Sequence, residues 1–153
     1  MTEMKARVTG ALKDAMRARD AVRLSTLRLI NAAIKDRDIA ARGEGDTVGV
    51  GDAEVLQILG KMVKQRQESA RAYEEGGRLE LAEQERAEIA VIEEFLPRQL
   101  AKDEVDAAIG AAISETGAES IRDMGRVMGA LKARYTGQMD FGAVGPLVKS
   151  RLG

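Results

Sequence analysis

A chain of 153 residues without cysteine or histidine cannot form disulfide bonds, thiol nucleophiles, Ser-His-Asp triads or zinc sites built from His and Cys. Hydrophobic residues make up 44% of the chain and can supply a core, but aromatic residues make up only 3%, which favours helices over sheets. The net charge is −1, and a sequence pI of about 5.7 argues against a dedicated nucleic-acid-binding domain, since such domains are usually basic.

The sequence shows no signal for secretion or for insertion into a membrane. Its first residues form a charged amphipathic stretch without the apolar segment and cleavage site of a signal peptide. No apolar run approaches the ~20 residues that span a bilayer. We therefore expect a cytoplasmic protein without a membrane partner.

Helical periodicity predicts four helices before Pro97. The first covers about 2–19, and the second begins near Asp20, a candidate N-cap, and fades in the glycine-rich stretch 42–51, a predicted flexible loop. The third begins at Asp52, another candidate cap, and ends at the glycine pair 76–77. The fourth begins near Arg78. Its expected apolar face is Leu81, Ala82, Ile89, Ile92, Phe95 and Leu96.

Three further helices are predicted after Pro97, because a residue before proline is disfavoured in the helical region and 96–100 is typical of a hinge. One centres on 105–113 and is closed by Gly117. The next begins with a capping-box-like pair, Ser120 and Asp123, and the last is capped by Asp140. We predict an all-α chain: a four-helix bundle in an N-terminal domain at 1–96, then a smaller three-helix bundle in a C-terminal domain at 97–153.

No motif for nucleotide, metal or acid–base chemistry is present. The sequence contains no GxxxxGK[ST] run, no dinucleotide fingerprint in a strand-to-helix context and no EF-hand spacing. Its many carboxylates are interpreted as solvating and ion-pairing groups. We therefore expect no catalytic residue, no metal and no cofactor, and we do not expect the chain to catalyse a reaction on its own.

Charge is distributed unevenly along the chain. Residues 1–42 contain 10 Lys/Arg and 5 Asp/Glu, residues 43–119 contain 8 and 18, and residues 120–153 contain 6 and 2. Two interpretations remain open: the basic ends bind an anionic partner, or the blocks neutralise one another when they pack.

Six short stretches carry a resemblance to a known family. They are Leu24-Ser25-Thr26-Leu27-Arg28, Ala32-Ala33-Ile34-Lys35, Lys64-Gln65-Arg66-Gln67-Glu68-Ser69, Gly77-Arg78-Leu79-Glu80-Leu81-Ala82, Phe95-Leu96-Pro97-Arg98-Gln99-Leu100 and Asp123-Met124-Gly125-Arg126-Val127-Met128. In this order and spacing they resemble the YqeY family, small bacterial proteins with a GatB/YqeY domain. The resemblance covers nearly the whole chain.

The resemblance implies two helical bundles and kinship with the C-terminal tail of the B subunit of tRNA amidotransferases. In those enzymes the tail is similar to a tRNA-contacting appendage, whereas transamidation takes place in a separate cradle domain. The implied function is a noncatalytic accessory module associated with tRNA or other RNA. The alternative is a protein-interaction module of a tRNA amidation or aminoacylation complex. Carbon–nitrogen ligation with glutamine as amido donor comes only as a family-level association.

The basic C-terminal block supplies the expected RNA-binding residues. They are Arg126, Lys132, Arg134, Tyr135, Lys149 and Arg151. Lys and Arg side chains would contact phosphates, and the tyrosine ring would stack on an unstacked base. The competing interpretation is that the tyrosine packs in the core and the charges form a solvated face.

A second candidate cluster lies on the third helix and the turn after it. It consists of Lys61, Lys64, Arg66, Ser69 and Arg78. These residues either bind phosphate or, in the case of Arg66, pair with a glutamate of the fourth helix. The GxxxG spacing of Gly125 and Gly129 favours close helix approach over ligand contact.

Overall fold

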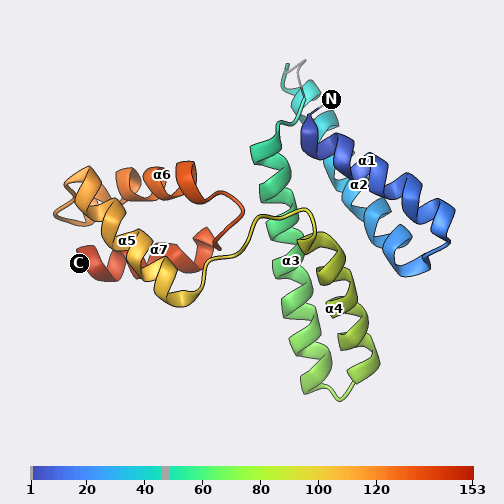
Figure 1. The fold of residues 1–153 in the computed structure, drawn as a ribbon. Coiled ribbons are helices and arrows are strands. Elements are labelled where there is room, and N and C mark those ends of the chain that lie inside the picture. The colour runs from blue at the N-terminus through green and yellow to red at the C-terminus, as the bar shows by residue number, and fades with distance from the viewer. Residues whose placement is uncertain (1, 46–48) are drawn as a thin grey trace. The chain divides into compact units, whose positions relative to one another are not determined.

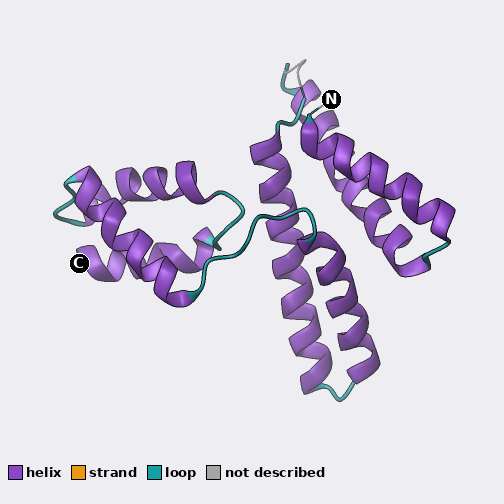
Figure 2. Cartoon of the chain, viewed as in Figure 1, coloured by secondary structure: helices purple, strands orange, loops and turns teal. Residues whose placement is uncertain are grey.

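The computed structural model describes residues 2–45 and 49–153, and all the regular elements in this part of the chain are helices (Figures 1 and 2). They are α1 (Glu3–Ala18), α2 (Ala21–Gly43), α3 (Asp52–Glu75), α4 (Leu79–Glu93), α5 (Lys102–Thr116), the 3₁₀ turn η1 (Ile121–Asp123), α6 (Met124–Tyr135) and α7 (Phe141–Leu152). The predicted all-α class is confirmed. Part of the loop expected at 42–51, residues 46–48, lies outside the described residues.

The helices form two compact units, which we call unit 1 (Met1–Leu96) and unit 2 (Pro97–Gly153). Unit 1 contains α1 to α4, and unit 2 contains α5 to α7 with η1. None of the helices in the described ranges is both long and apolar enough to cross a membrane.

Most helix ends lie where local capping chemistry predicts them. The Asp20 carboxylate accepts a hydrogen bond from the Arg23 N–H at 3.1 Å, and the Asp140 carboxylate accepts one from the Gly142 N–H at 2.9 Å. Gly117 ends α5 with φ of 67°, a conformation that glycine adopts without strain.

Asp52 is the exception, because it does not cap its own helix. The residue before α3 is Gly51, and Asp52 is the first residue of the helix itself. Its carboxylate instead accepts the backbone N–H of Met4 at 3.3 Å, in the first turn of α1. Asp52 therefore satisfies a free donor at the start of another helix.

The core of unit 1 lies where α1, α2, the first half of α3 and the end of α4 meet. The largest fully buried side chains there are Leu27, Ile30, Leu59 and Ile92. On α2, Leu27, Ile30 and Ile34 are buried on one face.

The far end of the α3–α4 hairpin extends beyond this core (Figure 1). The buried apolar residues of the hairpin outside that core are the small residues Ala70 and Ala82 and, further from the hairpin turn, Ile89. Leu81, expected in the core, is instead 36% exposed, and Leu79 is 62% exposed. With a single neighbouring helix, α4 can bury only a narrow stripe at this end.

Unit 2 has a separate core made by α5, α6, α7 and the residues just before α7. Ile109, Val127, Leu131 and Val148 are its most deeply buried members. The expectation for the GxxxG pair of α6 is wrong: a Cβ added at Gly125 or Gly129 would meet no atom within 4 Å. These glycines face open space and do not permit a close helix contact.

Candidate nucleic-acid interface

Three of the six expected RNA-binding residues form ion pairs within unit 2. Arg134 on α6 donates to Glu115 on α5 at 3.0 Å. Arg151 on α7 lies 3.8 Å from the carboxylate of Asp106 on α5 and donates to its backbone carbonyl at 3.1 Å. Packing α5 beside α6 and α7 therefore lets the acidic stretch neutralise part of the basic one.

Arg126 is held at the turn between α5 and α6. Its guanidinium donates to the Asp123 carboxylate at 2.6 Å and to the Thr116 carbonyl at 3.0 Å. Asp123 also accepts the backbone N–H groups of Glu119 and Ser120, as the capping-box pattern predicted. The N–H of Glu119 first, and then Arg126, hold the pKa of Asp123 below its usual range. Arg126 thus belongs to the start of α6.

Lys132 and Lys149 differ from the three arginines. Both are exposed, and neither forms an ion pair with any residue of the described chain. They lie in the last turns of α6 and α7, where a cation also stabilises the helix dipole. They are the two predicted lysines whose ammonium groups can meet a phosphate without first leaving a carboxylate.

Tyr135 is partly buried and packs against the core of unit 2. This agrees with the interpretation in which the tyrosine ring packs in the core. Part of the side chain remains accessible at the end of α6.

The structure does not bring the second candidate cluster, on α3 and the turn after it, together at one site. Arg66 lies 3.6 Å from Glu88 of α4, which confirms the expected pairing with a glutamate of the fourth helix. Lys61 is exposed near the middle of α3, and Arg78 is exposed at the start of α4. The helical rise places these two roughly 20 Å apart along the hairpin. Ser69 is half-buried and Lys64 is exposed, so the five residues do not share one site.

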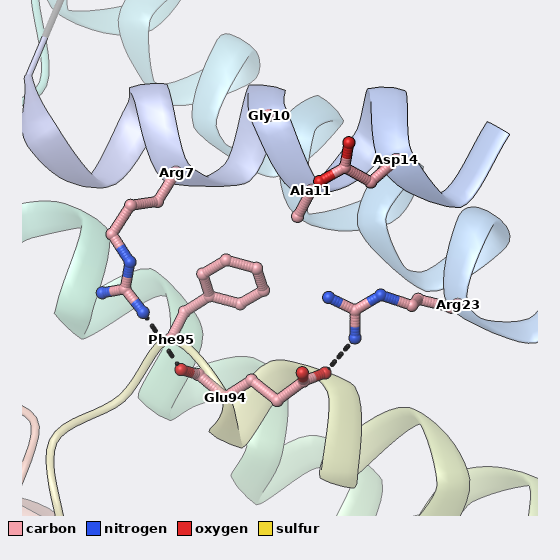
Figure 3. Close-up of a pocket in the computed structure, with 7 residues that line it drawn as sticks. All are labelled: Arg7, Gly10, Ala11, Asp14, Arg23, Glu94 and Phe95. Atoms are coloured by element: carbon pink, nitrogen blue, oxygen red, sulfur yellow. Dashed lines mark hydrogen bonds and ion pairs between the residues drawn. The ribbon is translucent and has the colours of Figure 1, made fainter. Parts of the chain in front are cut away.

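The sequence patterns did not reveal an open pocket of about 360 Å³ in unit 1 (Figure 3). It is lined by Arg7, Gly10, Ala11, Asp14, Arg23, Glu94 and Phe95. These residues come from three separate segments, so no local motif could have predicted their meeting.

Both arginines of this pocket contact the end of α4. The Arg7 guanidinium lies 5.4 Å from the Phe95 ring centroid and donates to the Glu94 carbonyl at 3.2 Å. Arg23 pairs with the Glu94 carboxylate (Figure 3). The two arginines therefore fasten α1 and α2 to the end of α4.

Across the described residues, no three acidic groups gather in a way that could hold a metal ion.

Comparisons with known proteins give two kinds of match. The family described as "Yqey-like protein" matches residues 5–152. Two curated relatives are both named "Altered inheritance of mitochondria protein 41, mitochondrial". The one from Clavispora lusitaniae is 36% identical over 85 residues, which is 56% of this chain and 46% of the relative. The one from Lachancea thermotolerans is 28% identical over 106 residues, or 68% of this chain and 54% of the relative.

The chain thus spans about half the length of the curated relatives it matches. These matches also correct the expected cytoplasmic location. Both relatives are named as mitochondrial proteins, which contradicts that expectation.

Proposed function

Since the chain belongs to the YqeY-like family, whose match covers residues 5–152, we propose that it is a noncatalytic accessory module that associates with tRNA or another RNA through unit 2. The proposal rests on the resemblance to the tRNA-contacting tail of amidotransferase B subunits. The observation that supports it is the exposure of Lys132 and Lys149 without a carboxylate partner in the described chain.

Unpaired surface cations favour contact with the phosphate backbone. Each phosphate neutralised by a lysine releases counterions, so affinity falls as salt rises, with a slope of about −0.7 to −0.9 per contact in log–log form. Arg126, Arg134 and Arg151 contribute less, because each must exchange an existing carboxylate for a phosphate. Two lysines imply weak binding that depends on shape more than on sequence.

Titration of labelled tRNA with the full chain at low and at moderate salt tests this proposal. We expect binding at low salt. The Lys132→Ala/Lys149→Ala variant should bind more weakly, and the steepness of its plot of log affinity against log salt concentration should decrease by about 1.5. The matched control is Lys13→Ala/Arg17→Ala, which removes two exposed cations from α1. Absence of binding at low salt, or an equal loss in the control, would contradict the proposal.

A second candidate function is a protein-interaction module of a tRNA amidation or aminoacylation complex. It is favoured by large apolar side chains exposed on unit 1, among them Val22, Leu29 and Ile39.

Carbon–nitrogen ligation by the chain alone is a third possibility from the family association. An assay with mischarged tRNA, glutamine and ATP tests it, and we expect no turnover.

We further propose that the two units are separate domains, a four-helix bundle at 1–96 and a three-helix bundle at 97–153. Each has its own buried cluster of apolar side chains. If so, each fragment expressed alone should unfold cooperatively in urea. A fragment that is unfolded in the absence of the other would contradict this division.

A further inference from the structure

The face of α2 that points away from the core of unit 1 carries large exposed apolar side chains. Thr26, Leu27, Ile30 and Ile34 are buried on the inner face. On the opposite side, exposed residues follow one another at intervals of three and four along the helix. They are Val22, Ser25, Leu29, Ala32, Asp36 and Ile39, which we call the outer stripe.

The large members of the outer stripe are well exposed: 48% for Val22, 46% for Leu29 and 65% for Ile39. Alternating intervals of three and four residues produce a continuous seam on a helix, as in a coiled coil. Large apolar side chains exposed along one side of a helix are typical of an interaction surface. Helix α2 packs against α1, α3 and α4, and every residue of the outer stripe remains exposed.

A line of cations borders the stripe. Arg28, Lys35 and Arg42 are exposed and follow at intervals of seven residues, so they lie along one flank of α2. Arg28 and Lys35 form no ion pair with any residue of the described chain, whereas Arg42 lies close enough to Asp38 on the same helix to help lower the pKa of that carboxyl. An occupant of the stripe would therefore gain by placing acidic residues opposite this line.

These features select among the possible occupants. In an antiparallel pair of α2 helices from two copies, the same flanks would face each other and bring the two lines of cations together. RNA would find phosphate contacts but no aromatic ring on the stripe for its bases. A bilayer would have to accommodate Asp36, which lies within the stripe. A helix of another protein fits the exposed apolar residues and the line of cations if its acidic residues lie on the flank opposite Arg28 and Lys35 and a neutral or basic residue lies opposite Asp36.

We propose that the outer stripe of α2, with its cationic flank, is the docking site for an acidic amphipathic helix of a partner protein. The proposal deepens the second candidate function and does not depend on RNA binding by unit 2. The partner helix packs its apolar seam against Leu29 and its neighbours, and its acidic flank pairs with Arg28 and Lys35.

The test uses the full chain and a defined peptide. The peptide is helical, has the 23-residue length of α2, and carries leucines at the seam positions and glutamates on its flanks. A second peptide has lysine in place of every glutamate. Fluorescence anisotropy of the labelled peptides gives the dissociation constants. We expect the acidic peptide to bind and the basic one not to bind.

Two variants examine the two parts of the surface. Leu29→Lys should weaken binding by at least about tenfold, and Leu29→Ala should weaken it in the same direction without adding charge. Arg28→Glu/Lys35→Glu should reverse the preference toward the basic peptide. The matched control is Leu147→Lys on α7, since Leu147 has the same 46% exposure as Leu29. This control should leave binding unchanged.

The proposal is overturned if neither peptide binds, or if the Leu29 variants bind as well as the wild-type chain. It is also overturned if the Leu29 variants instead abolish self-association or binding to phosphatidylserine vesicles. Titration of tRNA with the lysine variants of unit 2 is measured separately. Failure of peptide docking and failure of RNA association are therefore distinguishable.

Discussion

The Nε of Arg66 lies 3.6 Å from Oε2 of Glu88, across the α3–α4 hairpin and largely shielded from solvent. Another nitrogen of the same guanidinium donates to the Met62 carbonyl at 3.2 Å. The buried Nε has no hydrogen-bond partner within the described chain. Burial raises the pKa of Glu88, and the charge of Arg66 offsets only part of that effect. The contacts of Arg66 thus lie within the α3–α4 hairpin, and they explain its position without a bound phosphate.

Replacing Arg66 with methionine should destabilise the fold by about 1–3 kcal/mol at pH 7, because Glu88 is left half-buried without its cation. The pKa of Glu88 then rises further. The folded state consequently binds more protons than the unfolded state between about pH 4.3 and the raised pKa, so stability decreases as pH rises through this range. Urea unfolding should show a smaller loss at pH 5 than at pH 7.

The control for this pH dependence is Arg66→Met combined with Glu88→Gln, which carries no titratable group at either position. Its loss of stability relative to the wild-type chain should not grow between pH 5 and pH 7 in the way that Arg66→Met alone does. An identical pH response in the two variants would show that another group is responsible.

Asp38 joins α1, α2 and the segment before α3. Its Oδ1 accepts the Val50 N–H at 2.7 Å and the Lys5 ammonium at 3.0 Å. The Val50 N–H first, and then Lys5, lower the pKa of Asp38. The contribution of Asp38 to the free energy of unfolding is therefore present above about pH 4 and is lost as pH falls through the lowered pKa.

Asp38→Ala should reduce the free energy of unfolding by about 1–3 kcal/mol at pH 7, since the buried Val50 N–H loses its acceptor. The difference from the wild-type chain should shrink below pH 4. Asp36→Ala, an exposed carboxylate on the same helix, is the control and should change stability by no more than about 0.5 kcal/mol. Chemical denaturation at several pH values measures both.

Gly49→Ala should be destabilising by about 1–3 kcal/mol for two reasons. Gly49 has φ of 85°, which an L-residue adopts only with strain, and an added Cβ would lie 2.8 Å from Asp38 Oδ1. Gly43→Ala provides the comparison, because its Cβ would meet no atom within 4 Å and its φ is not positive. Thermal unfolding of the two variants should separate them clearly; equal melting temperatures would refute the role of this turn.

Gly129→Ala should stabilise unit 2 by about 0.5–1 kcal/mol. The residue is inside α6, where alanine is the better helix former, and the added methyl group meets open space. A decrease in stability, measured by urea unfolding of the full chain, would mean that a helix does approach closely at this position.

Local signals in the sequence were enough to predict the class of structure and most helix boundaries. Asp20, Gly117 and Asp140 act on the backbone within three or four residues of themselves, so their effect can be recognised from neighbouring letters. The pairing of Arg66 with a glutamate of α4 could also be predicted, because the hairpin brings glutamates of the next helix opposite α3.

How the remaining charged and apolar side chains are used depends on the packing of distant helices. The Asp52 carboxylate accepts the backbone N–H of Met4, 48 residues earlier in the chain, and Arg151 meets Asp106 across 45 residues. Periodicity identifies the apolar faces of α2 and α4, but only the packed helices show that Leu29 and Leu81 remain exposed. Local chemistry acts through the adjacent backbone, whereas these partners are brought together by packing that no short stretch of sequence encodes.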